Sequence, residues 1–239
     1  MSNSSLVNYK ILSPNHSGKR THTIDRITPH CVVGQLTAKS IAGCFPKGRN
    51  ASCNYGIGTN GDIALIVDEE NRSWCSSSSA NDQRAVTIEC ASDMKEPYTM
   101  NDTVYNKLID LCADICKRNG KNKLIWIPDK NKALAYVPKS NEIIITVHRW
   151  FANKSCPGDW LYNRLGDLAE TVNEKLKIKT ETVNEKLKVK TEMKKHWADI
   201  YRTNLIKKGI LQNPEQHKDL DAPVTKGIFF SVIDRITDK

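Results

Sequence analysis

The chain has 239 residues, a formal net charge of +9, 39% hydrophobic residues and 26% charged residues. This balance is too apolar for a disordered protein, and the length suits one ordinary domain with an appendage or two small domains. The positive surplus favours an anionic partner, such as nucleic acid, a membrane surface or an acidic wall polymer. Nucleic acid is disfavoured because basic and aromatic residues are not interleaved and no nucleic-acid-binding motif is found.

The chain begins with Met1-Ser2-Asn3-Ser4-Ser5, which lacks the basic start and apolar centre of a secretory signal. No apolar run approaches the ~20 residues that cross a bilayer, so we expect no membrane span. We therefore expect synthesis in a bacterial cytoplasm, followed by release if the protein works outside the cell.

The predicted elements alternate between strands and helices. A strand at 23–33 precedes a short helix at 37–43 and two apolar runs at 54–58 and 63–67, which Asn60-Gly61 joins as a hairpin. A strand at 84–91 precedes a helix from Asn101-Asp102 to Gly120. Strands at 124–127 and 143–147 then precede a helix that begins near Asp159. This alternation predicts α/β layers around one sheet.

The eight cysteines suggest a disulfide framework at first sight. Without a secretory signal, however, reduced thiols are the expected state. Cys112 and Cys116 are four residues apart within the helical pattern, which indicates small buried side chains.

Residues 171–181 are repeated almost unchanged as residues 182–192. Val172, Leu176, Val183 and Leu187 would share one helical stripe, although the alternation around Leu176 also fits a strand. We favour a helical spacer that continues the preceding helix. Residues 193–239 then predict a helix, a loop and a helix, which gives three parts: 1–170, 171–192 and 193–239.

Three residues stand out as candidate metal ligands. His148 follows an apolar strand, Cys156 lies on the loop after it in front of Pro157-Gly158, and His30 ends another predicted strand. A catalytic zinc takes three protein ligands and leaves a fourth position for water. If the loop folds back, these three side chains meet at one ion; a hydrogen-bonded core or surface histidine is the alternative.

The order of these motifs resembles the zinc-dependent N-acetylmuramoyl-L-alanine amidases, a family that includes phage endolysins and peptidoglycan recognition proteins. The resemblance covers about residues 20–172 and rests on Pro29-His30-Cys31, Val86-Thr-Ile-Glu89, His148-Arg149 and Lys154-Ser-Cys156-Pro157-Gly158. It implies a central mixed β-sheet flanked by helices, a zinc cofactor and bacterial peptidoglycan as the substrate. The bond cleaved in the family joins N-acetylmuramic acid to the first L-alanine of the stem peptide.

The resemblance also implies roles for individual residues. Zinc would be held by His30, His148 and Cys156, with Glu89 as general base and Lys154 stabilising the oxyanion. We expect a lower-ranked substrate-binding set of Asn54, Tyr55, Trp74 and Arg149, with plain packing as the alternative for Trp74. Some relatives have a catalytic tyrosine where the hairpin alignment places Cys53 here, so a catalytic role for Tyr55 is doubtful.

The last part, 193–239, resembles a single surface-layer-homology module in His196-Trp197-Ala198, Lys208-Gly209-Ile210 and Pro223-Val224-Thr225. This resemblance implies binding to anionic secondary wall polymers, and a dimerising element that forms a homodimer is the alternative. For the whole chain we expect a phage or prophage endolysin. A bacterial autolysin and a recognition protein that binds peptidoglycan without cutting it are the alternatives.

Overall fold

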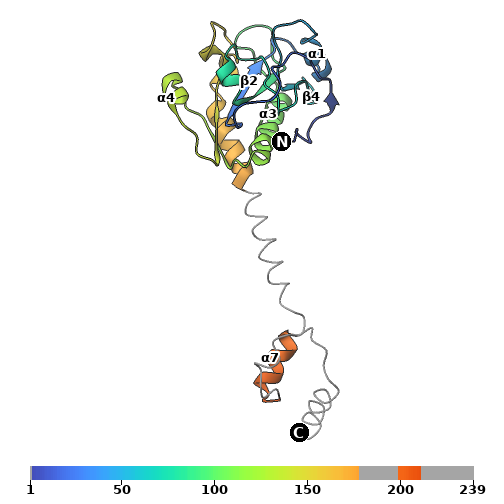
Figure 1. The fold of residues 1–239 in the computed structure, drawn as a ribbon, viewed down its shortest axis with the longest axis vertical. Helices are drawn as coiled ribbons and strands as arrows, with labels where there is room; N and C mark the ends of the chain where they lie inside the picture. The colour runs from blue at the N-terminus through green and yellow to red at the C-terminus, as the bar shows by residue number, and fades with distance from the viewer. Residues whose placement is uncertain (1, 178–198, 211–239) are drawn as a thin grey trace. The chain divides into compact units, whose positions relative to one another are not determined.

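The computed structural model describes residues 2–177 and 199–210. Its contacts divide the chain into two units, Met1–Lys179 and Thr180–Lys239 (Figure 1). In the second unit the described element is helix α7 (Asp199–Lys207), which falls within the first helix predicted for the C-terminal part. The rest of that predicted module lies outside the described residues, as do residues 178–192 of the repeat.

The first unit is built on a seven-stranded sheet with the order β1-β4-β3-β5-β2-β7-β6. Its middle strand is β5 (Ala85–Cys90), next to β2 (Arg26–Cys31), which pairs in parallel with both β5 and β7 (Glu142–Ile145). The predicted hairpin forms the antiparallel pair β3 (Tyr55–Ile57) and β4 (Ile63–Leu65), and β3 also pairs in parallel with β5. Two short edge strands complete the sheet, β1 (Tyr9–Lys10) and β6 (Lys123–Ile125). The predicted mixed sheet is confirmed.

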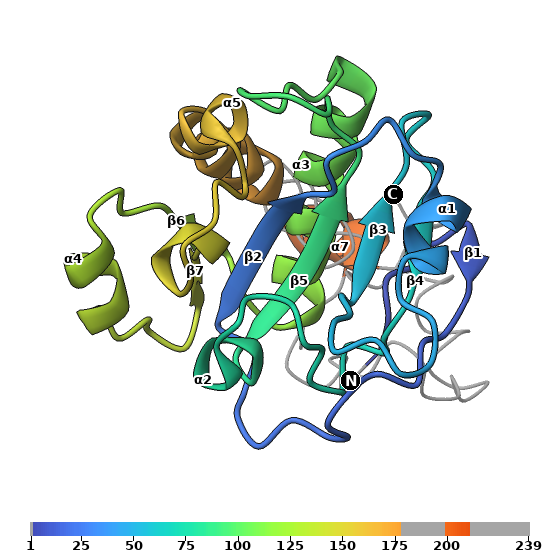
Figure 2. The same ribbon diagram turned by 90° about the horizontal axis from the view of Figure 1, so that it is seen from above.

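One face of the sheet carries the larger hydrophobic core. Helix α3 (Asp102–Arg118) starts where Asn101 caps the backbone N–H of Val104, and it lies behind β2, β5 and β3 in Figure 2. Its buried residues include Cys112 and Cys116, as expected for small apolar side chains. All eight cysteines of the chain are free thiols.

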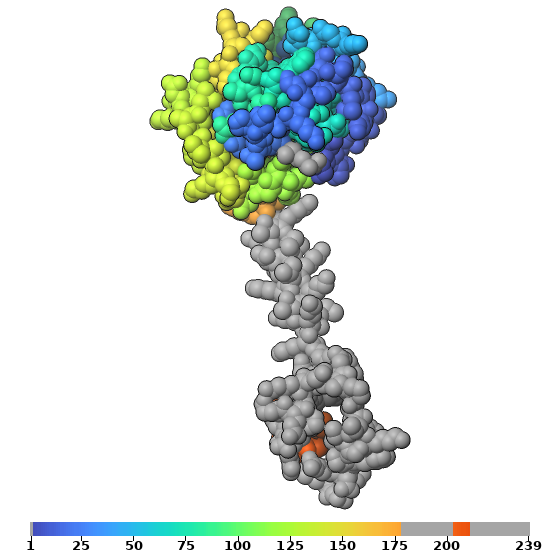
Figure 3. All heavy atoms as spheres, in the orientation of Figure 1, coloured from blue at the N-terminus to red at the C-terminus, as the bar shows by residue number. Residues whose placement is uncertain are grey.

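The other face carries a smaller core under helix α1 (Ala38–Gly43). Helix α1 packs so closely on β3 that a Cβ on Gly56 would lie 2.6 Å from Cγ2 of Ile41. Beside this core, the N-terminal segment runs along the segment that follows β4, where Lys19 and Asn71 form an isolated antiparallel β-bridge. Figure 3 shows these blue and teal segments together on one surface of the unit. The candidate site residues His30 and Glu89 lie at the carboxyl ends of β2 and β5.

The chain after β7 forms a short 3₁₀ helix, η1 (His148–Trp150), then α5 (Asp159–Tyr162) and a helical stretch over residues 165–177. The first part of the repeat is therefore helical, and its Val172 and Leu176 are buried in the larger core. The predicted boundary at residue 170 thus falls inside a helix that packs on the sheet domain.

Two further helices, α2 (Ser79–Asp82) and α4 (Lys130–Ala135), were not predicted because each is too short to show an apolar period. In the described parts of the chain, no helix has the length and apolarity needed to span a membrane.

Candidate metal centre

The register of the central strands puts two of the predicted site residues side by side. His30 on β2 pairs with Glu89 on β5, and side chains at paired positions of neighbouring strands lie on the same face of a sheet. Thr28, two residues before His30, bonds through its hydroxyl to that of Thr146 at 2.8 Å, so the chain that leaves β7 shares this face. His148 follows two residues later. Alternation along three strands therefore brings residues distant in sequence to one site.

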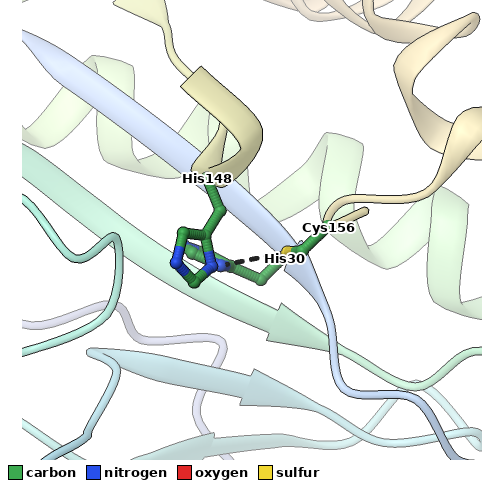
Figure 4. Close-up of side chains that lie close together, drawn as sticks. All are labelled: His30, His148 and Cys156. Carbon is green, nitrogen blue, oxygen red and sulfur yellow. Dashed lines mark hydrogen bonds between the residues drawn. The ribbon is translucent and has the colours of Figure 1, made fainter. Parts of the chain in front are cut away.

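Donor atoms from His30, His148 and Cys156 all lie within 4.8 Å of one another (Figure 4). Nδ1 of His30 is 3.2 Å from Sγ of Cys156, and the two imidazole rings meet edge to face with their centroids 5.1 Å apart. Two imidazoles and a thiol from three separate segments are a donor set that suits zinc. The loop after β7 does fold back, as the sequence analysis required.

Burial favours the neutral form of both imidazoles, which is the form that binds a metal ion. Burial lowers the pKa of His30 well below its usual value, and the nearby imidazole of His148 lowers it further. Burial also lowers the pKa of His148, with a smaller contribution from the charge of Lys154. Lys154 itself is exposed, so its charge is available beside the site.

Comparison with known proteins identifies the family. Residues 20–159, more than half of the chain, match the family described as N-acetylmuramoyl-L-alanine amidase. The chain belongs to this family. No curated protein sequence matches the amidase significantly.

Several solved structures are similar to the amidase at low sequence identity. A selenomethionine derivative of AmpD is 15% identical, with a TM-score of 0.50 over 71% of this chain and 99% of the other. Staphylococcus aureus hydrolase AmiA is 13% identical, with a TM-score of 0.49 over 76% of this chain and 94% of its own. PlyL is 15% identical, with a TM-score of 0.47 over 69% of this chain and 95% of its own.

Glu89 of the amidase faces the site from β5 in a poorly solvated position. Its Oε2 is buried without a hydrogen-bond partner, and its Oε1 lies 3.8 Å from Sγ of Cys75. Burial raises the pKa of this carboxyl to about 7, against smaller opposing effects from Cys75 and Arg49. A carboxylate whose pKa is near neutrality is suited to accept and return a proton.

A cleft of about 270 Å³ opens beside His148 and is lined by Trp74 and by Cys75, Ser77, Ser78 and Ser79. Trp74 is half-buried, and its indole N–H donates to Oγ of Ser17 at 2.7 Å. The predicted groove residue is therefore at the mouth of the site, with its ring held by the N-terminal segment.

Arg149 is not among the residues that line this cleft, so its expected role in substrate binding stays a prediction. Its guanidinium donates to the carbonyl of Ser155 and to Asp159 at 2.8 Å, and its backbone N–H donates to the carbonyl of Cys156 at 3.0 Å. These partners lie in the loop that carries Cys156 and at the start of α5. Arg149 therefore shapes the loop that brings the thiol to the two histidines.

Asn54 and Tyr55 need correction, because both are fully buried. Oδ1 of Asn54 accepts from the backbone N–H of Thr87 at 3.1 Å, and its amide donates to three carbonyls of residues 67–71. The Tyr55 hydroxyl lies between the N–H of Ser4 and Glu69, among core residues of the α3 face. Neither side chain has surface to offer a substrate, so both serve packing.

Two residues at the site were missed by the sequence analysis. Ser77 places its hydroxyl 3.0 Å from Nε2 of His148, and Cys75 lies against Glu89. Both come from the segment Ser73-Trp-Cys-Ser-Ser-Ser-Ser79, whose serine run is typical of any polar loop. The only usable signal was its tryptophan, which marked the segment as a candidate wall of the groove.

Proposed function

We propose that this amidase cleaves the bond between N-acetylmuramic acid and L-alanine of peptidoglycan with a zinc ion held by His30, His148 and Cys156. The observation that carries the proposal is the meeting of these three donors within 4.8 Å of one another. Zinc bound there would lower the pKa of a water molecule to about 7 and polarise the amide carbonyl.

The protein residues would supply the proton transfers and the charge. Glu89 is the proposed general base. Its Oε2 accepts no hydrogen bond from the protein, and burial raises the pKa of the carboxyl to about 7. It would take a proton during attack on the carbonyl and return it to the departing amine of L-alanine. Lys154 is proposed to stabilise the negative charge that develops on the carbonyl oxygen. Its positive charge lowers the pKa of His148, so its field reaches the site.

A recognition protein that binds peptidoglycan without cutting it is the competing function. The thiol of Cys156 favours the enzyme, because it supplies the third donor beside His30. Mass spectrometry of purified walls digested by the full chain decides between the two. The enzyme releases stem peptides with a free L-alanine amino group, and binding without release of peptides would refute the proposal.

The metal assignment has its own test. We expect about one tightly bound zinc per chain, loss of hydrolysis after chelation, and loss of both this tightly bound zinc and hydrolysis in Cys156→Ser. Cys44→Ser is the matched control, because Cys44 lies outside the three-donor cluster. Full activity of Cys156→Ser would refute the assignment of this ligand.

We further propose that the amidase works as a phage or prophage endolysin that reaches the wall after its release, with a bacterial autolysin as the alternative. Expression inside host cells tests this point. An endolysin lyses the cells only when a membrane-permeabilising agent is added, whereas an exported autolysin needs none.

Residues 193–239 are proposed to bind anionic secondary wall polymers or to form a homodimer. Binding of the full chain to walls before and after removal of these polymers tests the first role. Sedimentation measurements of the free chain test the second.

A further inference from the structure

Two buried polar atoms at the site have no hydrogen-bond partner. They are Nε2 of His30 and Oε2 of Glu89, and His30 is only 1% exposed. An unpaired buried polar atom is costly, so each such atom needs an explanation, and a bound ion is one of them. In the zinc assignment above, His30 uses the nitrogen that faces Cys156, which is Nδ1. The other nitrogen therefore remains unexplained.

A third donor completes a set with these two residues. Donor atoms of His30, Cys75 and Glu89 all lie within 4.8 Å of one another, and Sγ of Cys75 is 3.8 Å from Oε1 of Glu89. Buried Asp82 fixes the Cys75 segment, since it accepts from the N–H of Cys75 at 3.0 Å and from Oγ of Ser76 at 2.6 Å. The thiol is therefore held in place beside the carboxyl.

We propose that His30, Cys75 and Glu89 form a second, inhibitory binding site for a thiophilic divalent cation such as Zn²⁺ or Cd²⁺, adjoining the first site. A thiolate, an imidazole and a carboxylate together favour zinc-like ions, whereas Mg²⁺ and Ca²⁺ prefer oxygen donors alone. Cys75 lines the cleft beside His148, which gives an ion a path from solvent. The inhibition rests on the proposed role of Glu89 as general base, because a carboxylate bound to a cation no longer accepts a proton.

His30 belongs to both donor sets, which determines the proton balance. A neutral imidazole has one lone pair and one N–H, so simultaneous use of both ring nitrogens requires loss of the ring proton. Filling the second site therefore releases to solvent one proton from the Cys75 thiol, one from His30 and, in molecules where the Glu89 carboxyl is protonated, one from Glu89. No oxidant or other reactant is needed. Since this cost falls on the second ion, it binds more weakly than the first.

Cadmium titration of the chelator-treated full chain tests the site without any assay of hydrolysis. Cd²⁺ bound to a thiolate absorbs in the ultraviolet, and metal analysis gives the number of ions per chain. We expect two Cd²⁺ in the wild type, one in Cys75→Ser, one in Cys156→Ser and none when both are replaced. Cys44→Ser, the matched control, keeps two. Cys75→Ala is the second variant if Cys75→Ser does not fold.

A wild-type chain that binds one Cd²⁺, or a Cys75 variant that still binds two, would overturn the second site. Wall hydrolysis then tests the inhibition. Excess Zn²⁺ should suppress hydrolysis by the wild type. In Cys75→Ser, the ratio of hydrolysis with excess Zn²⁺ to hydrolysis without it should stay near one. Equal suppression of both would overturn the inhibitory role. If the one-zinc protein does not hydrolyse walls at all, the proposed function fails, and the cadmium counts still decide the second site.

Discussion

The hydroxyl of Ser77 lies 3.0 Å from Nε2 of His148, and the backbone of Ser77 has a φ of +61°, in the left-handed region. Non-glycine residues rarely adopt this conformation, and they do so mainly where the surrounding structure imposes it. The neighbouring Ser76 is held by Asp82, which accepts from its hydroxyl and from its N–H. The hydrogen bond leaves Nδ1 as the ring nitrogen of His148 that is free for a metal ion.

The first prediction follows from this contact. Ser77→Ala removes the hydrogen bond to His148, so the imidazole loses its fixed orientation, and we expect zinc affinity to fall by about 10–100-fold. Competition with a chromogenic chelator measures the affinity.

Ser77→Gly is the matched variant, because glycine adopts positive φ without strain but offers no hydroxyl. It should lose the same zinc affinity while its thermal stability equals or exceeds that of Ser77→Ala. Wild-type affinity in both variants would show that the contact does not position the ligand.

The second prediction concerns Glu89 and pH in the metal-free protein. Burial raises the pKa of this carboxyl from 4.5 to about 7, so the folded state holds a proton that the unfolded state has released. The contribution of Glu89 to stability should therefore fall as the pH rises between these two values, because ionisation of this carboxyl is penalised only in the folded state. The lowered pKa values of His30 and His148 act in the opposite direction, so the contribution of Glu89 is the difference between the wild type and Glu89→Gln. Thermal unfolding with chelator present, at several pH values, measures the effect.

Glu89→Gln should remove this pH dependence and make the metal-free protein more stable than the wild type at pH 8. The same variant should keep its first zinc and lose at least about 100-fold in hydrolysis, the usual contribution of a general base. An unchanged slope of stability against pH would mean that another group titrates in this range.

The sequence predicted the meeting of His30, His148 and Cys156 better than the contacts of the residues around them, and the reason is physical. His30 and Cys156 lie in short motifs whose residue types are needed for the chemistry, and strand alternation placed His30 beside Glu89. The roles of Asn54 and Arg149 depend instead on hydrogen bonds to carbonyls distant in the fold or in a folded-back loop. No residue pattern encodes those partners.

The third prediction separates packing from substrate binding at Tyr55. Its hydroxyl accepts from the N–H of Ser4 at 2.9 Å and donates to the buried Glu69, which also pairs with Arg118. Tyr55→Phe leaves these buried groups short of one partner, so we expect a loss of about 1–3 kcal/mol in unfolding free energy. Chemical denaturation of the zinc-loaded protein measures it.

The kcat/KM for wall fragments should stay unchanged in Tyr55→Phe below the unfolding temperature, because the ring lies on the α3 face of the sheet, away from His30. Tyr9→Phe is the control, since its hydroxyl bonds to Asp62 at the sheet edge and its loss should cost less stability. A change in KM without a loss of stability would restore the substrate-binding role of Tyr55.

The fourth prediction tests how Arg149 acts on the thiol ligand. Its guanidinium joins the carbonyl of Ser155 and the carboxylate of Asp159, on either side of Cys156. Arg149→Ala frees this loop, so zinc affinity should fall by about 10-fold or more, as for other residues that orient metal ligands.

Asp159→Asn is the milder match, because it weakens the ion pair and leaves the bonds to Ser155. It should lie between the wild type and Arg149→Ala in zinc affinity. If Arg149 instead contacted substrate, both variants would hold zinc as tightly as the wild type, and only the KM of Arg149→Ala would rise.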